Sequence, residues 1–147
     1  MRRLEIRHET ALPVGELSAL ALRGGPEGET QLLAVGDEDF AVVSTKFTDG
    51  PVPTDVRRRD LHSALRDTQV GLEHGSAFEG AASDGAGTIV LLQEDQARLL
   101  VLAPDLSRLL QVLVLAVAAD QPEIGPGWQR EPNARGEGLL LLANATS

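Results

Sequence analysis

Few side chains of this sequence are candidates for catalysis or for metal binding. His74 lies five residues before Glu79, and an imidazole there could act as a base or a metal ligand, although a loop histidine is commonly just exposed. The run Asp37-Glu38-Asp39 offers carboxylates but lacks the spacing of a calcium-binding EF-hand loop, so we expect a solvated hairpin turn. No G-x-S-x-G, H-E-x-x-H or P-loop motif is present. The enzyme classes that these motifs identify therefore have no support here.

Composition narrows the possible partners and the kind of core. The 147 residues carry a net charge of −9, which argues against a nucleic acid or an anionic membrane as partner. Aromatic residues make up only 3%, so the core must be aliphatic, and the absence of cysteine excludes disulfides and thiolate metal sites. The one basic cluster, Arg57-Arg58-Arg59 between Asp55 and Asp60, is predicted to be a solvated loop.

The sequence also bears on where the protein is found. Glu5, Arg7 and Glu9 stand where a secretory signal would need apolar residues. The most apolar run, residues 109–119, is too short to span a bilayer. We therefore expect a soluble, cytoplasmic protein.

The secondary structure of the chain is easiest to predict in residues 76–117, where short apolar runs alternate with tight polar turns. The pattern predicts four strands, at residues 78–82, 88–92, 97–103 and 109–117. The main alternative is a helix over residues 106–119, because Leu and Ala favour helices and Asp105 or Ser107 could cap one. The valines that follow a Pro-Asp turn favour the strand. This unit is a four-stranded antiparallel meander, as in one blade of a β-propeller.

An earlier part of the chain repeats this unit. Residues 32–45 and 89–102 share four apolar residues, an acidic turn and a second apolar run, at an offset of 57 (89 − 32). The strands before them begin at Ser18 and Glu79, at an offset of 61 (79 − 18). The predicted strands of this first unit cover residues 17–22, 31–35 and 40–46.

The fourth strand of the first unit must come from residues 48–75, where residues 60–67 could instead form a helical turn capped by Asp60. A third unit begins at Glu137-Gly138, 58 residues after Glu79-Gly80 (137 − 79). The chain is thus predicted to be one all-β domain, residues 1–147, of antiparallel four-stranded repeats that form β-propeller blades in an incomplete ring. Its units are residues 16–75, 76–120 and the start of a third at 133–147, and residues 3–8 form an isolated N-terminal strand.

Two short motifs carry a resemblance to a known family. Phe78-Glu79-Gly80-Ala81-Ala82, and Asn133 followed by Arg135-Gly136-Glu137-Gly138-Leu139, resemble blade openings of six-bladed β-propellers in the SdiA-regulated and phytase-esterase-like group. That group is similar to propellers of the gluconolactonase and paraoxonase type. The resemblance covers residues 17–142, or about two blades.

The resemblance implies that the first strand of each blade lines a central channel. Glu79 and Glu137 would then lie at equivalent places near its mouth, and with Asn133 they would hold a calcium ion, which takes roughly six to eight oxygen ligands. The equivalent residue in the first unit is Ser18, so the acidic pattern is incomplete. The alternative is that the glutamates accept hydrogen bonds from backbone N–H groups or solvate the channel rim.

These observations lead to three functional hypotheses. The first is a propeller scaffold that binds a small ligand or a metal ion in its channel. The second is a calcium-dependent esterase, lactonase or phytase-esterase-like hydrolase, with His74 as its possible base. The third is a protein-interaction domain that uses the loop around Trp128.

Closing a propeller takes roughly four to eight blades. The missing blades would come from the remainder of a longer propeller or from further copies of the chain, unless the fold is instead a sandwich or barrel.

Overall fold

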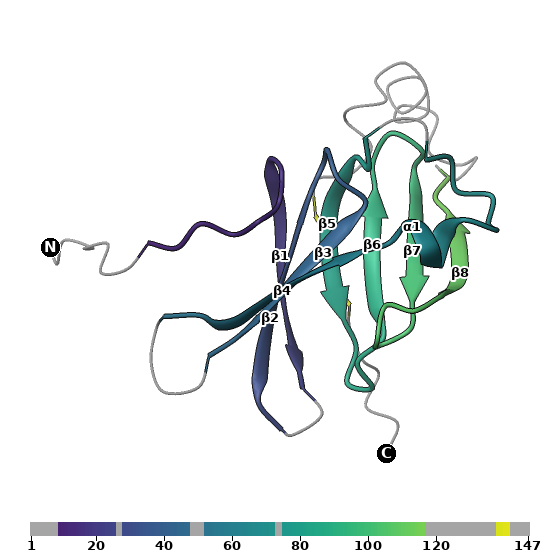
Figure 1. Ribbon diagram of the computed structural model, residues 1–147. Coiled ribbons are helices and arrows are strands. Elements are labelled where there is room, and N and C mark those ends of the chain that lie inside the picture. The colour runs from purple at the N-terminus through teal and green to yellow at the C-terminus, as the bar shows by residue number, and fades with distance from the viewer. Residues whose placement is uncertain (1–8, 26–27, 48–51, 73–74, 117–137, 142–147) are drawn as a thin grey trace, which may run out of the picture.

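The computed structural model describes residues 9–25, 28–47, 52–72, 75–116 and 138–141. Within them the chain forms two four-stranded sheets and one short helix, α1 (His62–Leu65) (Figure 1). Sheet A contains β1 (Leu17–Gly24), β2 (Thr30–Gly36), β3 (Ala41–Lys46) and β4 (Thr54–Asp60). Sheet B contains β5 (Phe78–Ser83), β6 (Ile89–Gln93), β7 (Arg98–Leu102) and β8 (Leu109–Val114).

Both sheets are antiparallel meanders in which the strands pair in chain order. The predicted fold class, all-β with repeated four-stranded antiparallel units in an incomplete ring, is confirmed. The strand at the end of the second unit is confirmed as well, because residues 109–114 pair with β7, and the alternative of a helix there is wrong.

The two sheets share an irregularity in their first strands. The pairing of β1 with β2 shifts register at Ser18, and the pairing of β5 with β6 shifts at Glu79. A shift of this kind is a β-bulge, which turns a side chain away from the regular alternation of the strand. The sequence offset of 61 had made these two residues equivalent, and the structure places both at the same irregularity.

The hydrogen bonds beside the bulges repeat too. The Asp37 N–H donates to the Glu16 carbonyl oxygen (3.3 Å), and the Glu94 N–H donates to the Ala77 carbonyl oxygen (2.9 Å). Glu16 and Ala77 both have positive φ angles, of 33° and 47°, immediately before the first strand of their sheets. The two units therefore repeat in backbone geometry as well as in their sequence pattern of apolar and acidic residues.

The region after β3 corrects two expectations. Arg57, Arg58 and Arg59 form part of strand β4, and not a loop, although all seven residues of that strand are exposed. The helical turn follows the strand and does not replace it. The Asp60 carboxylate accepts a hydrogen bond from the His62 N–H (2.8 Å), but the N-cap residue of α1 is Leu61.

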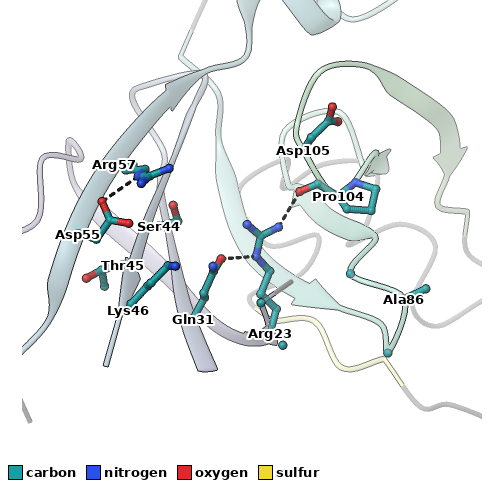
Figure 2. Close-up of a pocket in the computed structure, with 14 residues that line it drawn as sticks. Arg23, Gln31, Ser44, Thr45, Lys46, Asp55, Arg57, Ala86, Pro104 and Asp105 are labelled. Carbon is teal, nitrogen blue, oxygen red and sulfur yellow. Dashed lines mark hydrogen bonds and ion pairs between the residues drawn. The ribbon is translucent and has the colours of Figure 1, made fainter. Parts of the chain in front are cut away.

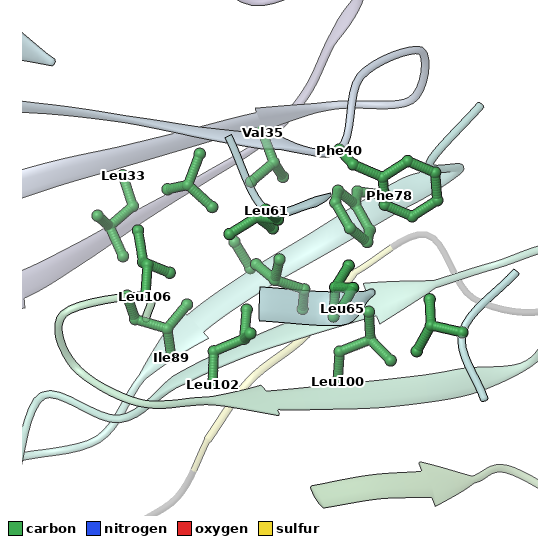
Figure 3. Close-up of a cluster of buried hydrophobic side chains, with 14 residues drawn as sticks. Leu33, Val35, Phe40, Leu61, Leu65, Phe78, Ile89, Leu100, Leu102 and Leu106 are labelled. Atoms are coloured by element: carbon green, nitrogen blue, oxygen red, sulfur yellow. The ribbon is translucent and has the colours of Figure 1, made fainter. Parts of the chain in front are cut away.

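The core lies between the two sheets (Figure 3). Leu33 and Val35 of β2 face the aliphatic side chains of β6 and β7 across this layer, and Leu61 and Leu65 of the α1 region fill the space between them. Its fully buried aliphatic members include Leu33, Val35, Leu61, Leu65, Ile89, Leu91, Leu100 and Leu102. Phe40 and Phe78 meet edge to face in this core, with ring centroids 5.7 Å apart. The core is thus almost wholly aliphatic, as the composition predicts.

The predicted third unit is only partly described. Residues 138–141 form no strand, so the first strand of that unit stays a prediction. They do lie against β5, since a Cβ added at Gly80 would be 3.0 Å from the Leu139 Cβ. Strand β5 is in turn a direct neighbour of β1. The openings of successive units therefore lie one beside the next.

Candidate functional site

Only one of the four predicted site residues lies in the described part of the chain. Glu79 occupies the bulge of β5 and is partly buried. His74, Asn133 and Glu137 lie outside the described residues. The counterpart of Glu79 in sheet A, Ser18, donates a hydrogen bond from its Oγ to the Glu16 carbonyl oxygen (3.0 Å).

A second pair of equivalent acids lies at the same end of the sheets. We call this the entry end; it holds the bulges and the turns from β2 to β3 and from β6 to β7. Asp37 and Glu94 begin those two turns, at the sequence offset of 57. Asp37 Oδ1 and Glu94 Oε1 are both buried, and neither has a hydrogen-bond partner in the described part of the chain. Glu94 is only 8% exposed.

The joint between the sheets fixes this arrangement. The Ala77 N–H donates to the Asp37 carbonyl oxygen (2.7 Å), while the Ala77 carbonyl accepts from Glu94, so one residue bridges the two turns. Beside it, the buried Ser76 Oγ donates to the Gly36 carbonyl oxygen (2.8 Å). These bonds hold the backbone of both acidic turns in place while leaving a carboxylate oxygen of each without a donor.

Buried carboxylate oxygens without donors are costly, because burial removes water and nothing replaces it. A cation or a hydrogen-bond donor supplied by a ligand would satisfy them. The described residues contain no group of three or more His, Asp or Glu arranged to hold a metal ion. A calcium site at the entry end would therefore need ligands such as Asn133 and Glu137 in addition to Glu79.

Sequence reasoning missed Asp37 and Glu94 because an acidic turn is usually solvated. Of the run Asp37-Glu38-Asp39, Glu38 is exposed and the other two are partly buried, so the expectation of a simple solvated turn is wrong for Asp37. One signal was available: the acidic turn occurs at the same place in both units, and solubility alone does not require that.

A cleft of about 560 Å³ opens between the sheets at the opposite end (Figure 2). Sheet A contributes its polar side chains, and sheet B contributes two turns of small residues. The lining includes Arg23, Gln31, Ser44, Lys46, Asp55, Arg57, Gly85, Ala86, Gly87, Pro104 and Asp105. No pattern in the sequence indicated this cleft.

Arg23 spans the cleft from sheet A to sheet B. Its Nη1 donates to the Pro104 carbonyl oxygen (2.7 Å) and its Nε to Gln31 Oε1 (3.0 Å). Gln31 Nε2 donates to Glu29 Oε1 (2.8 Å), which also pairs with Lys46 Nζ (2.9 Å). Burial lowers the pKa of Arg23, and the nearby Glu29 carboxylate opposes that effect. An arginine remains charged in either case.

Two acids of the cleft are engaged locally. Asp55 Oδ1 accepts from Arg57 Nε (2.8 Å), and this contact raises the pKa of Arg57. Asp105 accepts from the Ser107 hydroxyl (2.7 Å) and N–H (3.1 Å), which lower its pKa, and its side chain points away from Arg23 in Figure 2. Both carboxylates are therefore held by neighbours on their own strand or turn.

Comparison with known proteins does not assign this chain to a family. No protein-family model matches this chain, and no curated protein matches it. The likeness to SdiA-regulated and phytase-esterase-like propellers thus remains a prediction from the sequence. In the described part of the chain, no helix has the length and apolar character that crossing a membrane requires.

Proposed function

We propose that this chain is a β-propeller scaffold module that binds a small ligand or a metal ion at its entry end, in a channel lined by the first strand of each sheet. The observation that carries the proposal is the repeated pair of buried carboxylate oxygens on Asp37 and Glu94 without hydrogen-bond donors. The bulges at Ser18 and Glu79 support it, because bulges commonly redirect side chains beside binding sites.

The ligand class that fits these groups is a cation or a donor-rich small molecule. Calcium suits an all-oxygen site, and Glu79, with Asn133 and Glu137, would complete its ligands by the family resemblance. The same resemblance implies a second candidate activity, calcium-dependent ester or lactone hydrolysis. His74 would be its possible base.

Thermal unfolding with and without added calcium tests the binding proposal. A ligand that binds only the folded state stabilises it by about 2.7 kcal/mol at a concentration of 100 times Kd. We expect calcium to raise the Tm of the wild-type chain, and we expect Glu94→Gln and Glu79→Gln to reduce that rise. The matched control is Glu38→Gln, in the same acidic turn but exposed, which should respond to calcium as the wild type does.

Two outcomes contradict the proposal. One is that neither calcium nor ammonium-bearing small molecules change the Tm of the wild type. The other is that Glu38→Gln removes the response as fully as Glu94→Gln, because bulk charge would then be the cause. Ester hydrolysis measured on the same samples separates the hydrolase from the scaffold, since only the hydrolase loses turnover with Glu79→Gln in saturating calcium.

The free face of sheet A supports ring closure by further sheets. Leu20 and Leu22 on this face are 53% and 63% exposed. The repeat relates residues of this face to residues of sheet B. In the first strands, whose offset is 61, Leu20 corresponds to Ala81; in the second strands, whose offset is 57, Leu32 corresponds to Ile89. Ala81 and Ile89 are buried on the face of sheet B that sheet A covers. We infer that another sheet covers the free face in the assembled protein, from a longer chain or from a second copy.

A further inference from the structure

We propose that the cleft between the sheets, at the end opposite the acidic turns, binds a small anion through its carboxylate or phosphate group, with Arg23 as the principal contact. The chain is strongly acidic, with 22 Asp and Glu against 13 Lys and Arg, yet three of its basic side chains line this one cleft. They are Arg23, Lys46 and Arg57.

Among the residues that the structure describes, no carboxylate forms a direct ion pair with Arg23. Its two hydrogen bonds go to neutral oxygens, of Gln31 and Pro104, and they use one N–H of Nε and one of Nη1, on opposite sides of the planar guanidinium, so the second Nη1 proton and both Nη2 protons remain. Glu29, the carboxylate whose charge acts on Arg23, is already shared by Lys46 and Gln31. Arginine presents five N–H donors in a fixed geometry that suits carboxylate and phosphate oxygens. Its remaining donors are therefore available to an anion in the cleft.

The surroundings hold the guanidinium ready for binding. The Gln31 side chain is oriented by its hydrogen bond to Glu29, and its Oε1 orients the Arg23 guanidinium in turn. Asp55 has a φ of 52° at a register shift of β4 and holds Arg57 on the same side of sheet A as Ser44, its partner in β3. Side chains that are already oriented lose less freedom when a ligand binds.

The opposite wall leaves room for the ligand. It contains the turn Gly85-Ala86-Gly87 and Pro104, which have small or compact side chains, and Asp105, whose carboxylate is engaged by Ser107. Gly87 has a φ of 84°, a backbone conformation that favours glycine, so the turn itself calls for the smallest residue there. A cleft of about 560 Å³ accommodates a small organic anion.

Titration of the 147-residue chain with inorganic phosphate, and separately with malonate, tests this site by ¹H–¹⁵N NMR at constant ionic strength. We expect saturable shifts of the Arg23 Nε–H signal and of the Gly85 and Gly87 amides. The two anions tell phosphate from carboxylate preference. Arg23→Gln should weaken binding about tenfold or more, because a charged hydrogen bond is lost. Arg108→Gln, an exposed change in a turn of sheet B that does not line the cleft, should bind as the wild type does.

Because Arg23→Gln also removes the bond to Pro104, Arg57→Gln serves as a second variant that leaves this bond intact, and it should weaken binding a few-fold. The proposal is overturned if neither anion gives saturable shifts in the cleft. It is overturned equally if folded Arg23→Gln and Arg57→Gln bind with unchanged affinity. None of these results depends on the calcium response of the entry end.

Discussion

The two sheets should unfold as one unit because two of the three phenylalanines of the chain join them. Phe40 precedes β3 of sheet A and Phe78 begins β5 of sheet B, and their rings meet edge to face at an interplanar angle of 85°. Both are buried, with Phe78 at 0% exposure. Replacing a buried Phe by Ala costs about 3–5 kcal/mol, which is a large part of the roughly 5–15 kcal/mol that stabilises a whole domain.

A double-mutant cycle isolates the contact between the rings. Leucine keeps much of the bulk and removes the aromatic contact, so we compare Phe40→Leu, Phe78→Leu and the double variant by urea unfolding. Edge-to-face pairs contribute about 0.5–1.5 kcal/mol beyond their buried area, and we expect a coupling energy in that range. The control is Val114→Ala on β8, which is 78% exposed and should change stability by less than about 0.5 kcal/mol.

The cycle also tests cooperativity between the sheets. If they form one unit, each single variant shifts a single transition seen equally by far-UV circular dichroism and by NMR signals from both sheets. If the chain instead shows two separate transitions, and Phe78→Leu shifts only the transition of sheet B, the sheets do not unfold as one unit. A coupling energy indistinguishable from zero would refute the role of the ring contact alone.

Three other changes have defined outcomes. Gly80→Ala should lower the free energy of unfolding in urea by about 1–3 kcal/mol, because the added Cβ would lie 3.0 Å from the Cβ atoms of Leu92 and Leu139. The control is Gly24→Ala, whose Cβ would meet nothing within 4 Å and which should be nearly neutral. Equal effects of the two changes would contradict this prediction. Leu22→Glu should lower the mass measured by light scattering if the free face associates with a second copy, and an unchanged oligomer would place that contact elsewhere. The backbone N–H of His62 lowers the pKa of Asp60, so Asp60 stabilises the fold above its unfolded pKa of about 3.9 and loses this contribution as the pH falls through its folded value. Asp60→Asn should therefore flatten the decline of Tm below about pH 4, and an unaltered decline would exclude Asp60 as a contributor.

Local patterns in the sequence were enough to predict most of the fold. Apolar runs separated by acidic or glycine-rich turns located seven of the eight strands, and the offset of 61 correctly paired Ser18 with Glu79. The eighth, β4, has every residue exposed, so its sequence carries no alternation of buried and exposed positions. An edge strand of this kind is recognisable only from the neighbour with which it pairs.

The sites were harder to predict because they depend on contacts between units. The burial of Asp37 and Glu94 arises where the two sheets meet, through Ala77, and turn composition does not report it. The cleft depends on the contact between Arg23 and Pro104, 81 residues apart in the chain. Whether a side chain between the sheets is buried or lines a cleft depends on its contacts with the neighbouring sheet. The sequence of a single strand does not contain that information.

The exposed strand β4 also determines how the protein meets other extended chains. The outermost strand of a sheet offers unpaired backbone groups to any passing strand, and consecutive arginines discourage such pairing through mutual repulsion. Strand β8, at the corresponding edge of sheet B, has the opposite character, with the apolar Leu110 and Val114 exposed and no charged residue. Sheet A is therefore protected against edge-to-edge aggregation at β4. The growth of fibrils, or the addition of a peptide strand, would begin at β8.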